Sequence, residues 1–253
     1  MFKFAANISL MFQELPFERR FEAAKQAGFD GVEFMFPEDL TSSEIRALLD
    51  DNGLKQVLAN LPLLPGTKGL AAVPGQEGLF KEQFLSGLDF ALAADAPLLH
   101  MTAGVVPDQE YEDARDTFRS NMMWASEQIK GTDLKLVVEA INQDDAPGYF
   151  FRSLDDARQW TQRLEPLGLL FDLYHCAKEG LDVLSICNKY CKKAAHIQIA
   201  GHPGRHEPDN GSLPYRSLIK AIEKSGYRGW VGCEYIPAKG TLSGLSWMDG
   251  LSK

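Results

Sequence analysis

The sequence lacks any apolar segment of membrane length and is short of cysteine. No stretch approaches the roughly 18 consecutive apolar residues that a spanning helix needs. Its start shows no basic segment followed by an apolar run, so we expect no signal peptide. The four cysteines lack the paired spacing of a zinc knuckle. We therefore expect free thiols and a cytoplasmic location.

Positive charge is also in deficit, with 26 basic residues against 35 acidic ones and a net charge of −9 at pH 7. Such a balance repels phosphate backbones and anionic membrane surfaces. We therefore expect neither a nucleic-acid nor a membrane partner. The sequence is compatible with a homo-oligomer. The 45% hydrophobic and 24% charged residues are ordinary values for a folded chain, which argues against disorder and coiled coil.

A Gly-rich phosphate loop is missing as well. A doubly wound open sheet usually carries such a loop after its first strand, whereas residues 7–11 read Asn-Ile-Ser-Leu-Met. The length of 253 residues instead suits a (β/α)8 barrel. This absence therefore favours the barrel over the open sheet.

Apolar strands alternate with amphipathic helices along the whole chain, without a linker or a break in composition. We expect strands at 2–8, 31–36, 54–60, 97–102, 135–139, 167–172, 194–198 and 230–234, and helices at 16–27, 41–49, 80–94, 111–130, 153–164, 182–190, 215–225 and 242–253. The loop at 61–78 is rich in proline and glycine, and we expect it to cover a site. The pattern predicts an α/β fold, with residues 1–253 forming a single (β/α)8 TIM-barrel domain.

Four oxygen-bearing side chains end successive strands, namely Glu139, Asp172, Gln198 and Glu234. The carboxyl ends of barrel strands converge on one face, so we expect these side chains to meet. Three carboxylates held together raise one another's pKa unless a cation neutralises them, and oxygen ligands favour Mg²⁺ or Mn²⁺ over zinc. The pattern therefore predicts a divalent metal site. A helix cap or a surface charge is the alternative for each acid alone, and a backbone hydrogen bond is the alternative for Gln198.

Further polar residues lie beside these strand ends. His175, on the loop that we expect after the sixth strand, is placed to hydrogen-bond a substrate oxygen or to assist proton transfer. We expect Asn7 and His100, near the ends of the first and fourth strands, to line the pocket. Glu33 at the end of the second strand could also point inward, although two facing glutamates without a second metal are costly.

Arg205 lies in the polar segment that directly follows the seventh strand. Its planar guanidinium suits bidentate binding of a substrate carboxylate. An ion pair limited to Glu207 or Asp209 is the alternative interpretation. We therefore expect Arg205 to bind an acidic substrate.

Six motifs give the chain a family resemblance. They are Ala-Ala-Asn-Ile-Ser at 5–9, Gly-Val-Glu-Phe-Met-Phe-Pro at 31–37, Val-Glu-Ala-Ile-Asn at 138–142, Gln-Ile-Ala-Gly at 198–201, Arg-His-Glu-Pro at 205–208 and Gly-Trp-Val-Gly-Cys-Glu-Tyr at 229–235. Nearly end to end, the chain resembles the hydroxypyruvate isomerase family, within the xylose-isomerase-like TIM barrels.

That resemblance implies an aldose–ketose type isomerase with a small-molecule substrate. It implies conversion of hydroxypyruvate to 2-hydroxy-3-oxopropanoate (tartronate semialdehyde), by metal-assisted proton transfer through an enediolate. In the family, the glutamates that match Glu139 and Glu234 form the catalytic acid/base pair. Together with the positions that match Asp172 and Gln198, they also bind the divalent metal.

The resemblance leaves the length of the substrate open. Segments 103–107 and 200–209 also resemble the related 2-oxo-tetronate isomerases, which act on an acid with one more carbon. Ser212 stands where the family often has a glutamate, so substrate choice is not fixed by the motifs.

Three other functions are alternatives. A ketose 3-epimerase would use the same metal and two acids but would act at one carbon. A zinc phosphodiesterase acting on damaged DNA is disfavoured by the acidic charge and by only five histidines. A non-catalytic sugar-acid sensor on a degenerate barrel would have no need of two proton-transfer glutamates.

Overall fold

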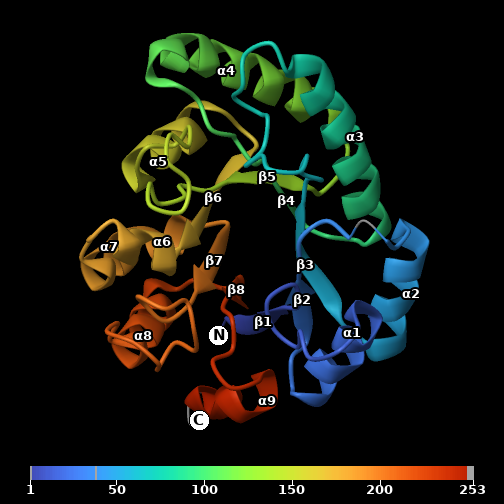
Figure 1. The fold of residues 1–253 in the computed structure, drawn as a ribbon, viewed down its shortest axis with the longest axis vertical. Helices are drawn as coiled ribbons and strands as arrows, with labels where there is room; N and C mark the ends of the chain where they lie inside the picture. Colours follow the sequence, from blue (N-terminus) through green and yellow to red (C-terminus); the bar gives the residue numbers. More distant parts are fainter. Residues whose placement is uncertain (1, 38, 250–253) are drawn as a thin grey trace. The chain divides into compact units, whose positions relative to one another are not determined.

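Eight parallel strands follow one another in chain order around a closed barrel in the computed structural model, which describes residues 2–37 and 39–249 (Figure 1). The strands are β1 (Lys3–Asn7), β2 (Gly31–Glu33), β3 (Lys55–Asn60), β4 (Leu98–His100), β5 (Lys135–Val138), β6 (Leu167–Asp172), β7 (His196–Ile199) and β8 (Trp230–Cys233). The α-helices are α1 (Phe17–Gln26), α2 (Ser42–Asn52), α3 (Glu77–Ala93), α4 (Tyr111–Gln128), α5 (Leu154–Arg163), α6 (Leu173–Lys178), α7 (Val183–Tyr190), α8 (Tyr215–Ser225) and α9 (Thr241–Gly244). Three short 3-10 helices lie at Asp108–Glu110, Cys191–Lys193 and Leu245–Met248. The predicted (β/α)8 TIM barrel is confirmed. None of the described helices is long and apolar enough to cross a bilayer.

The predicted and observed elements differ most after β6. The sequence does not predict α6, because its six residues are mainly apolar and show no amphipathic periodicity. His175 therefore lies on a helix and not on the expected loop. The closing helix expected at 242–253 is observed as α9 and a 3-10 helix, and residues 250–253 of that expectation lie outside the described residues.

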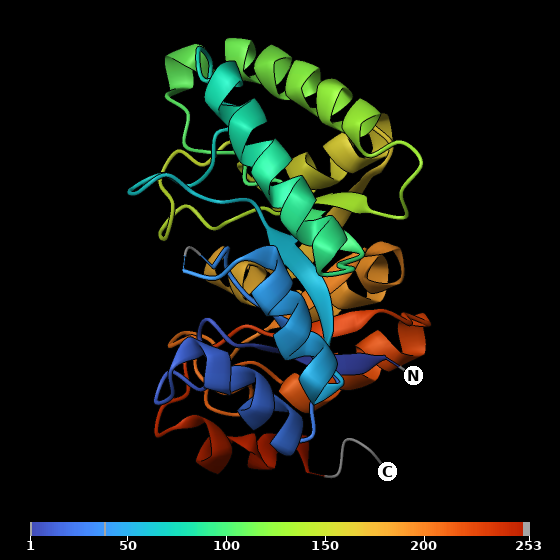
Figure 2. The same ribbon diagram turned by 90° about the vertical axis from the view of Figure 1, so that its right-hand side faces the viewer.

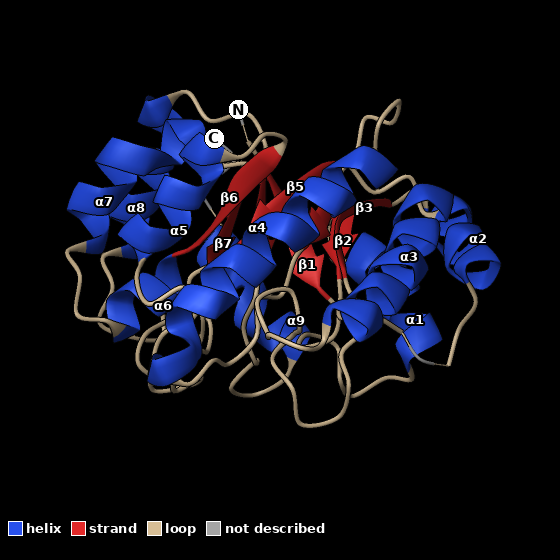
Figure 3. Ribbon diagram, turned by 90° about the horizontal axis from the view of Figure 1, so that it is seen from above, coloured by secondary structure: helices blue, strands red, loops and turns tan. Residues whose placement is uncertain are grey.

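The described residues form two compact units. Unit 1 contains residues 2–34, 47–55 and 171–249, and unit 2 contains residues 35–37, 39–46 and 56–170. In unit 1, β1 pairs with β2 and β8, and β7 pairs with β8. The register places Asn7 opposite Glu33 and Gln198 opposite Gly232. Helices α7 and α8 of this unit lie side by side (Figures 1 and 3).

Unit 2 pairs β3 with β4, β4 with β5, and β5 with β6. Its helices α3 and α4 lie side by side (Figure 2), and edge-to-face contacts of Trp124 with Phe80 and Phe84 fill the space between them. The irregular segment before α3 is anchored in the same unit, since Ala72 donates a backbone hydrogen bond to Ala103 at 2.8 Å. Part of the loop predicted to cover a site is thus a buried component of unit 2.

Helix α5 shows how local sequence fixes these elements. The hydroxyl of Ser153 accepts a hydrogen bond from the Asp156 backbone N–H at 3.2 Å, which satisfies one of the unpaired donors of the first turn. The helix then buries Ala157 and Trp160 on one face. The cap therefore defines where the helix begins, and burial of the apolar face stabilises it.

We predict that Ser153→Ala lowers the free energy of unfolding by about 1 kcal/mol, because it removes this N-cap. Denaturant unfolding measures the change. Ser126→Ala is the matched control, since its hydroxyl donates to the Met122 carbonyl in the interior of α4 and does not lie at a helix start. Equal destabilisation by the two substitutions would contradict the capping role of Ser153.

Candidate active site

Glu33 is the centre of a buried hydrogen-bond cluster in unit 1. Its side chain is fully buried and accepts hydrogen bonds from His196 Nε2 at 2.6 Å, Gln198 Nε2 at 2.7 Å and Asn7 Nδ2 at 3.3 Å. A carboxylate removed from water needs such donors, because nothing else solvates its charge. We call these four residues the Glu33 cluster.

Gly232 of β8 makes room for the Glu33 carboxylate. A Cβ atom at this position would collide with both carboxylate oxygens of Glu33. Any side chain at residue 232 would therefore displace the carboxylate from its donors. The close approach of β8 to the Glu33 cluster requires glycine.

The Glu33 cluster also fixes the direction in which Gln198 faces. Because the amide nitrogen of Gln198 donates to Glu33, its amide oxygen Oε1 points away from that carboxylate. Gln198 is 3% exposed, and among the described residues its Oε1 has no hydrogen-bond donor. A buried oxygen in this state is a suitable ligand for a hard divalent cation. The donor set at this position thus fits the metal that the sequence predicts.

Arg205 forms the main ion pair at the carboxyl end of β8. Its Nη2 lies 2.6 Å from Glu234 Oε2 and 3.5 Å from Asp172 Oδ2. The guanidinium carbon also lies 4.9 Å from the ring centre of Tyr174, in cation–π geometry. The Arg205 backbone has φ 54°, a left-handed conformation that is uncommon outside glycine and is found at ligand-binding loops.

The loop that carries Arg205 is closed by its own backbone. Gly201 donates to the His206 carbonyl and Ser212 donates to the His202 carbonyl, each at 2.8 Å. The carboxylate of Glu207 accepts the Ala238 backbone N–H at 3.1 Å. Arg205 therefore pairs with strand-end acids, and Glu207, the partner considered from the sequence, instead holds the neighbouring segment.

Glu234 is a buried acid with an elevated pKa. Burial raises the pKa of Glu234 to about 8, and the negative charges of Asp172 and Glu33 add to this effect, while the Arg205 guanidinium opposes it. Asn7 Nδ2 donates to Glu234 Oε1 at 3.4 Å. A carboxyl group in this environment can both hold and release a proton near neutral pH.

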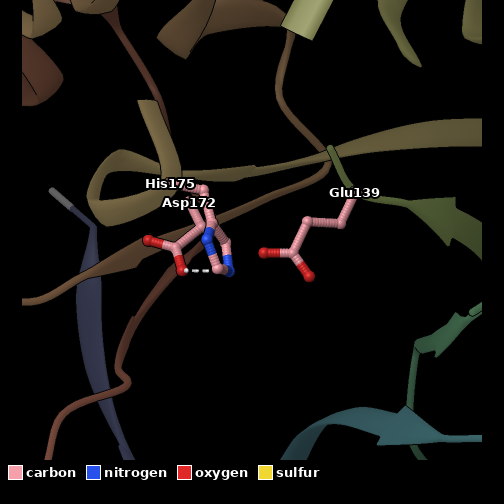
Figure 4. Close-up of side chains that lie close together, drawn as sticks. All are labelled: Glu139, Asp172 and His175. Carbon is pink, nitrogen blue, oxygen red and sulfur yellow. Dashed lines mark ion pairs between the residues drawn. The ribbon is translucent and has the colours of Figure 1, made fainter. Parts of the chain in front are cut away.

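Asp172 is both a helix cap and a member of the site. Its Oδ1 accepts the Tyr174 backbone N–H at 2.8 Å and so begins α6. Its Oδ2 lies 3.5 Å from His175 Nε2, the ion pair that is dashed in Figure 4. The cap proposed as an alternative for Asp172 therefore exists together with its position in the site.

In unit 2, Glu139 lies beside His100. The Nε2 atom of His100 lies 3.7 Å from Glu139 Oε2, and its Nδ1 lies 3.1 Å from Asn60 Oδ1. Both His100 and Glu139 are 5% exposed. Burial raises the pKa of the nearby Tyr149 phenol, with a smaller contribution from Glu139, so this phenol stays neutral. The end of β5 therefore carries a buried carboxylate, as the sequence predicts.

Within unit 1, Asp172 and His175 each offer one ligand atom to a metal ion (Figure 4). Asp172 belongs to the ligand set predicted from the sequence. His175 is predicted there to bind substrate, and its ring nitrogen makes it a candidate ligand as well.

Glu33 and His196 are buried residues of the site that reasoning from strand ends does not find. The predicted cost of Glu33 takes account of the opposing carboxylates but not of its three hydrogen-bond donors. The signal was present in β7, where His196 and Gln198 lie two residues apart and so share one face of the strand. Two donors on one inward face, opposite a glycine in β8, indicate a buried acceptor.

Comparisons with known proteins agree with this architecture. Residues 21–251 match the family described as "Xylose isomerase-like TIM barrel". The 2-oxo-tetronate isomerase of Cupriavidus necator is 39% identical over 252 residues, covering 97% of both chains. The hydroxypyruvate isomerase of Escherichia coli is 36% identical over 258 residues, covering 98% of this chain and 99% of that one.

A solved structure gives a similar result. The crystal structure titled "AP endonuclease, family 2" from Brucella melitensis matches with a TM-score of 0.94 and 38% identity, and each chain is covered to 98%. The similarity therefore extends over essentially the whole chain in both sequence and fold.

Proposed function

Because the chain belongs to the xylose isomerase-like TIM barrel family and is an isomerase, we propose that it moves the carbonyl group between adjacent carbons of a short hydroxy-oxo acid. The observation that carries this proposal is the contact between Glu234 and Arg205 at 2.6 Å. It joins a buried acid, whose pKa is about 8, to a guanidinium suited to a substrate carboxylate. Proton transfer and recognition of an acid are the two requirements of the reaction.

A metal site is part of the proposal. Glu139, Asp172, Gln198 and Glu234 would hold Mg²⁺ or Mn²⁺, with His175 as a further candidate ligand. The buried Oε1 of Gln198 supports this assignment, because it has no hydrogen-bond donor among the described residues. A bound divalent ion supplies polarisation of the substrate carbonyl and neutralises charge that develops on its oxygen.

Glu139 and Glu234 would move the proton between the two carbons. Isomerisation removes a proton from the hydroxyl-bearing carbon and returns one to the former carbonyl carbon. Glu234 suits this transfer because it is buried and because its hydrogen bonds with Arg205 and Asn7 fix the orientation of the carboxyl group.

Arg205 would bind the substrate carboxylate, and His175 would orient a substrate oxygen. Both contacts of Arg205 with acids use Nη2, and its side chain is 26% exposed, so the guanidinium is accessible to a ligand. Asn7 is committed to Glu33 and Glu234, which favours a positioning role for it over direct substrate binding. His100 lies beside Glu139 and would act at that end of the substrate.

Hydroxypyruvate and the four-carbon 2-oxo-tetronate are the two candidate substrates. Relatives of both kinds overlap in their identity to this chain, since the 2-oxo-tetronate isomerases of Cupriavidus necator and Pectobacterium atrosepticum are 39% and 33% identical and the hydroxypyruvate isomerase of Escherichia coli is 36% identical. Segments 103–107 and 200–209 resemble the 2-oxo-tetronate isomerases, and this resemblance favours the four-carbon acid. Ser212 Oγ lies 3.3 Å from His202 Nδ1 in the loop that carries Arg205.

The proposal is tested by measuring whether the purified protein converts each of the two candidate substrate acids. Conversion of hydroxypyruvate, of the four-carbon 2-oxo acid and of a panel of ketoses is measured in deuterium oxide by NMR, with and without EDTA. We expect metal-dependent movement of the carbonyl between adjacent carbons of an acid. Failure to convert either acid, or exchange only at carbon 3 of ketoses, would refute it.

The organisation of the chain as a single domain, a homo-oligomeric state and a cytoplasmic location remain predictions.

Arg205→Lys is predicted to raise KM for the acid by about tenfold to a hundredfold, because a charge-assisted bidentate contact is lost while one positive charge remains. Steady-state kinetics measure the effect. Arg228→Lys is the control, since within the described residues the Arg228 side chain donates to the neighbouring Tyr227 carbonyl and to no acid. An unchanged KM in Arg205→Lys would assign the carboxylate to another group.

A further inference from the structure

The Glu33 cluster contains a residue pair that proton transfer and substrate binding do not use. Glu33 and His196 are 0% and 1% exposed, so neither can contact a substrate directly. Their contact is nonetheless short, at 2.6 Å, and it shares the Glu33 carboxylate with Gln198. A buried charged group that is fully supplied with donors must act through the residues that it holds.

We propose that Glu33 is a positioning residue, which orients the Gln198 amide so that its oxygen faces the metal site. This inference rests on the proposed function. A glutamine amide has two nearly isosteric orientations, and only the orientation with Oε1 outward offers a ligand to a cation. The carboxylate of Glu33 selects this orientation, because it can accept a hydrogen bond but cannot donate one.

His196 and Asn7 hold Glu33 in place for this task. The imidazole N–H of His196 binds Oε2, and the Asn7 amide shares Oε1 with Gln198. The oxygen Oε2 is therefore directed toward His196 of β7, and Oε1 lies between Gln198 of β7 and Asn7 of β1. Gly232 closes the arrangement from β8, where a Cβ atom would collide with the same two oxygens. Outer contacts of this kind change metal affinity by about 10- to 100-fold when they are removed.

The test measures Mn²⁺ affinity by electron paramagnetic resonance and calorimetry, independently of turnover. Glu33→Leu removes the acceptor, and we expect Mn²⁺ affinity to fall by about 10- to 100-fold. Glu33→Gln retains one acceptor oxygen for Gln198, while its amide group can donate to His196 after a change of tautomer. We therefore expect Glu33→Gln to restore affinity to within about fivefold of the wild type.

A double-mutant cycle separates positioning from a general structural role. In the Gln198→Ala background there is no amide to orient, so Glu33→Leu should change Mn²⁺ affinity by less than about twofold. A full loss in both backgrounds would overturn the inference, as would an unchanged affinity in Glu33→Leu. If Glu33→Leu does not fold by circular dichroism, Gly232→Ala takes its place in the same cycle with the same expected results.

The outcomes also separate this inference from the proposed function. Coupled losses of Mn²⁺ affinity in a protein that converts no hydroxy-oxo acid would support the positioning role and refute the proposed reaction. Uncoupled or absent losses in an active, metal-dependent isomerase would refute the positioning role alone. A wild-type protein that binds no Mn²⁺ would overturn both.

Discussion

Replacing Glu234 with glutamine is expected to lower kcat by about a thousandfold, the typical size of a lost general acid or base. Glutamine keeps the shape and one oxygen ligand but cannot hold and release the proton. The pair with Arg205 also loses its charge, while the contact of this guanidinium with Asp172 is kept. We therefore expect kcat to fall far more than Mn²⁺ affinity. Steady-state kinetics and metal titration of the same preparation measure the two effects.

The matched control is Glu223→Gln, an exposed glutamate on α8 of the same unit. Its kcat should stay within about twofold of the wild type, since surface substitutions away from a site are usually neutral. Glu139→Gln tests the second acid in the same way. Turnover near the wild-type value in Glu234→Gln would remove this residue from proton transfer and leave Glu139 as the principal candidate.

Removal of divalent metal is expected to reduce the rate of isomerisation by at least about a hundredfold, because a Lewis acid lowers the barrier of such a reaction by several kcal/mol. Addition of Mg²⁺ or Mn²⁺ should restore activity, since oxygen atoms dominate the proposed ligand set. Metal should also raise Tm. Saturation at 100 times the Kd corresponds to about 2.7 kcal/mol of added stability.

Circular dichroism of the chelated protein provides the control for this experiment. An unchanged spectrum with lost activity places the effect at the site and not in the fold. Full activity at less than one metal ion per ten chains, verified by elemental analysis, would contradict the metal requirement. Restoration by Zn²⁺ alone would contradict the oxygen-rich ligand set.

The fold was predictable because its determinants are local. Alternation of apolar strands and amphipathic helices specifies the barrel. At the start of α2, the Thr41 N–H donates to the Glu44 carboxylate at 2.8 Å, a capping box between residues three apart in the sequence. Strand ends carrying polar residues were predictable for the same reason. Side chains alternate between the two faces of a strand, so His196 and Gln198 of β7, two residues apart, lie on one face.

The partners of these side chains could not be predicted, because they depend on contacts between residues that are distant in the sequence. The pairing of Arg205 with Glu234 and the convergence of three donors on Glu33 follow from register and burial, which a single sequence does not display. Helix α6 is not predicted for another reason. Its six residues show no amphipathic periodicity, and its start depends on the Asp172 carboxylate acting as a cap as well as a strand-end acid.

The internally closed loop at residues 201–212 has a consequence for how new specificities can arise on this scaffold. Its backbone bonds, from Gly201 to His206 and from Ser212 to His202, are made within the loop itself. The Arg205 carbonyl also accepts the Ile236 N–H at 2.9 Å, and the Arg205 guanidinium pairs with Glu234, so this residue links the loop to the end of β8. Directed evolution could therefore vary the other side chains of the loop while Arg205 is kept. A library of this kind should yield variants that retain the reaction while changing the acid.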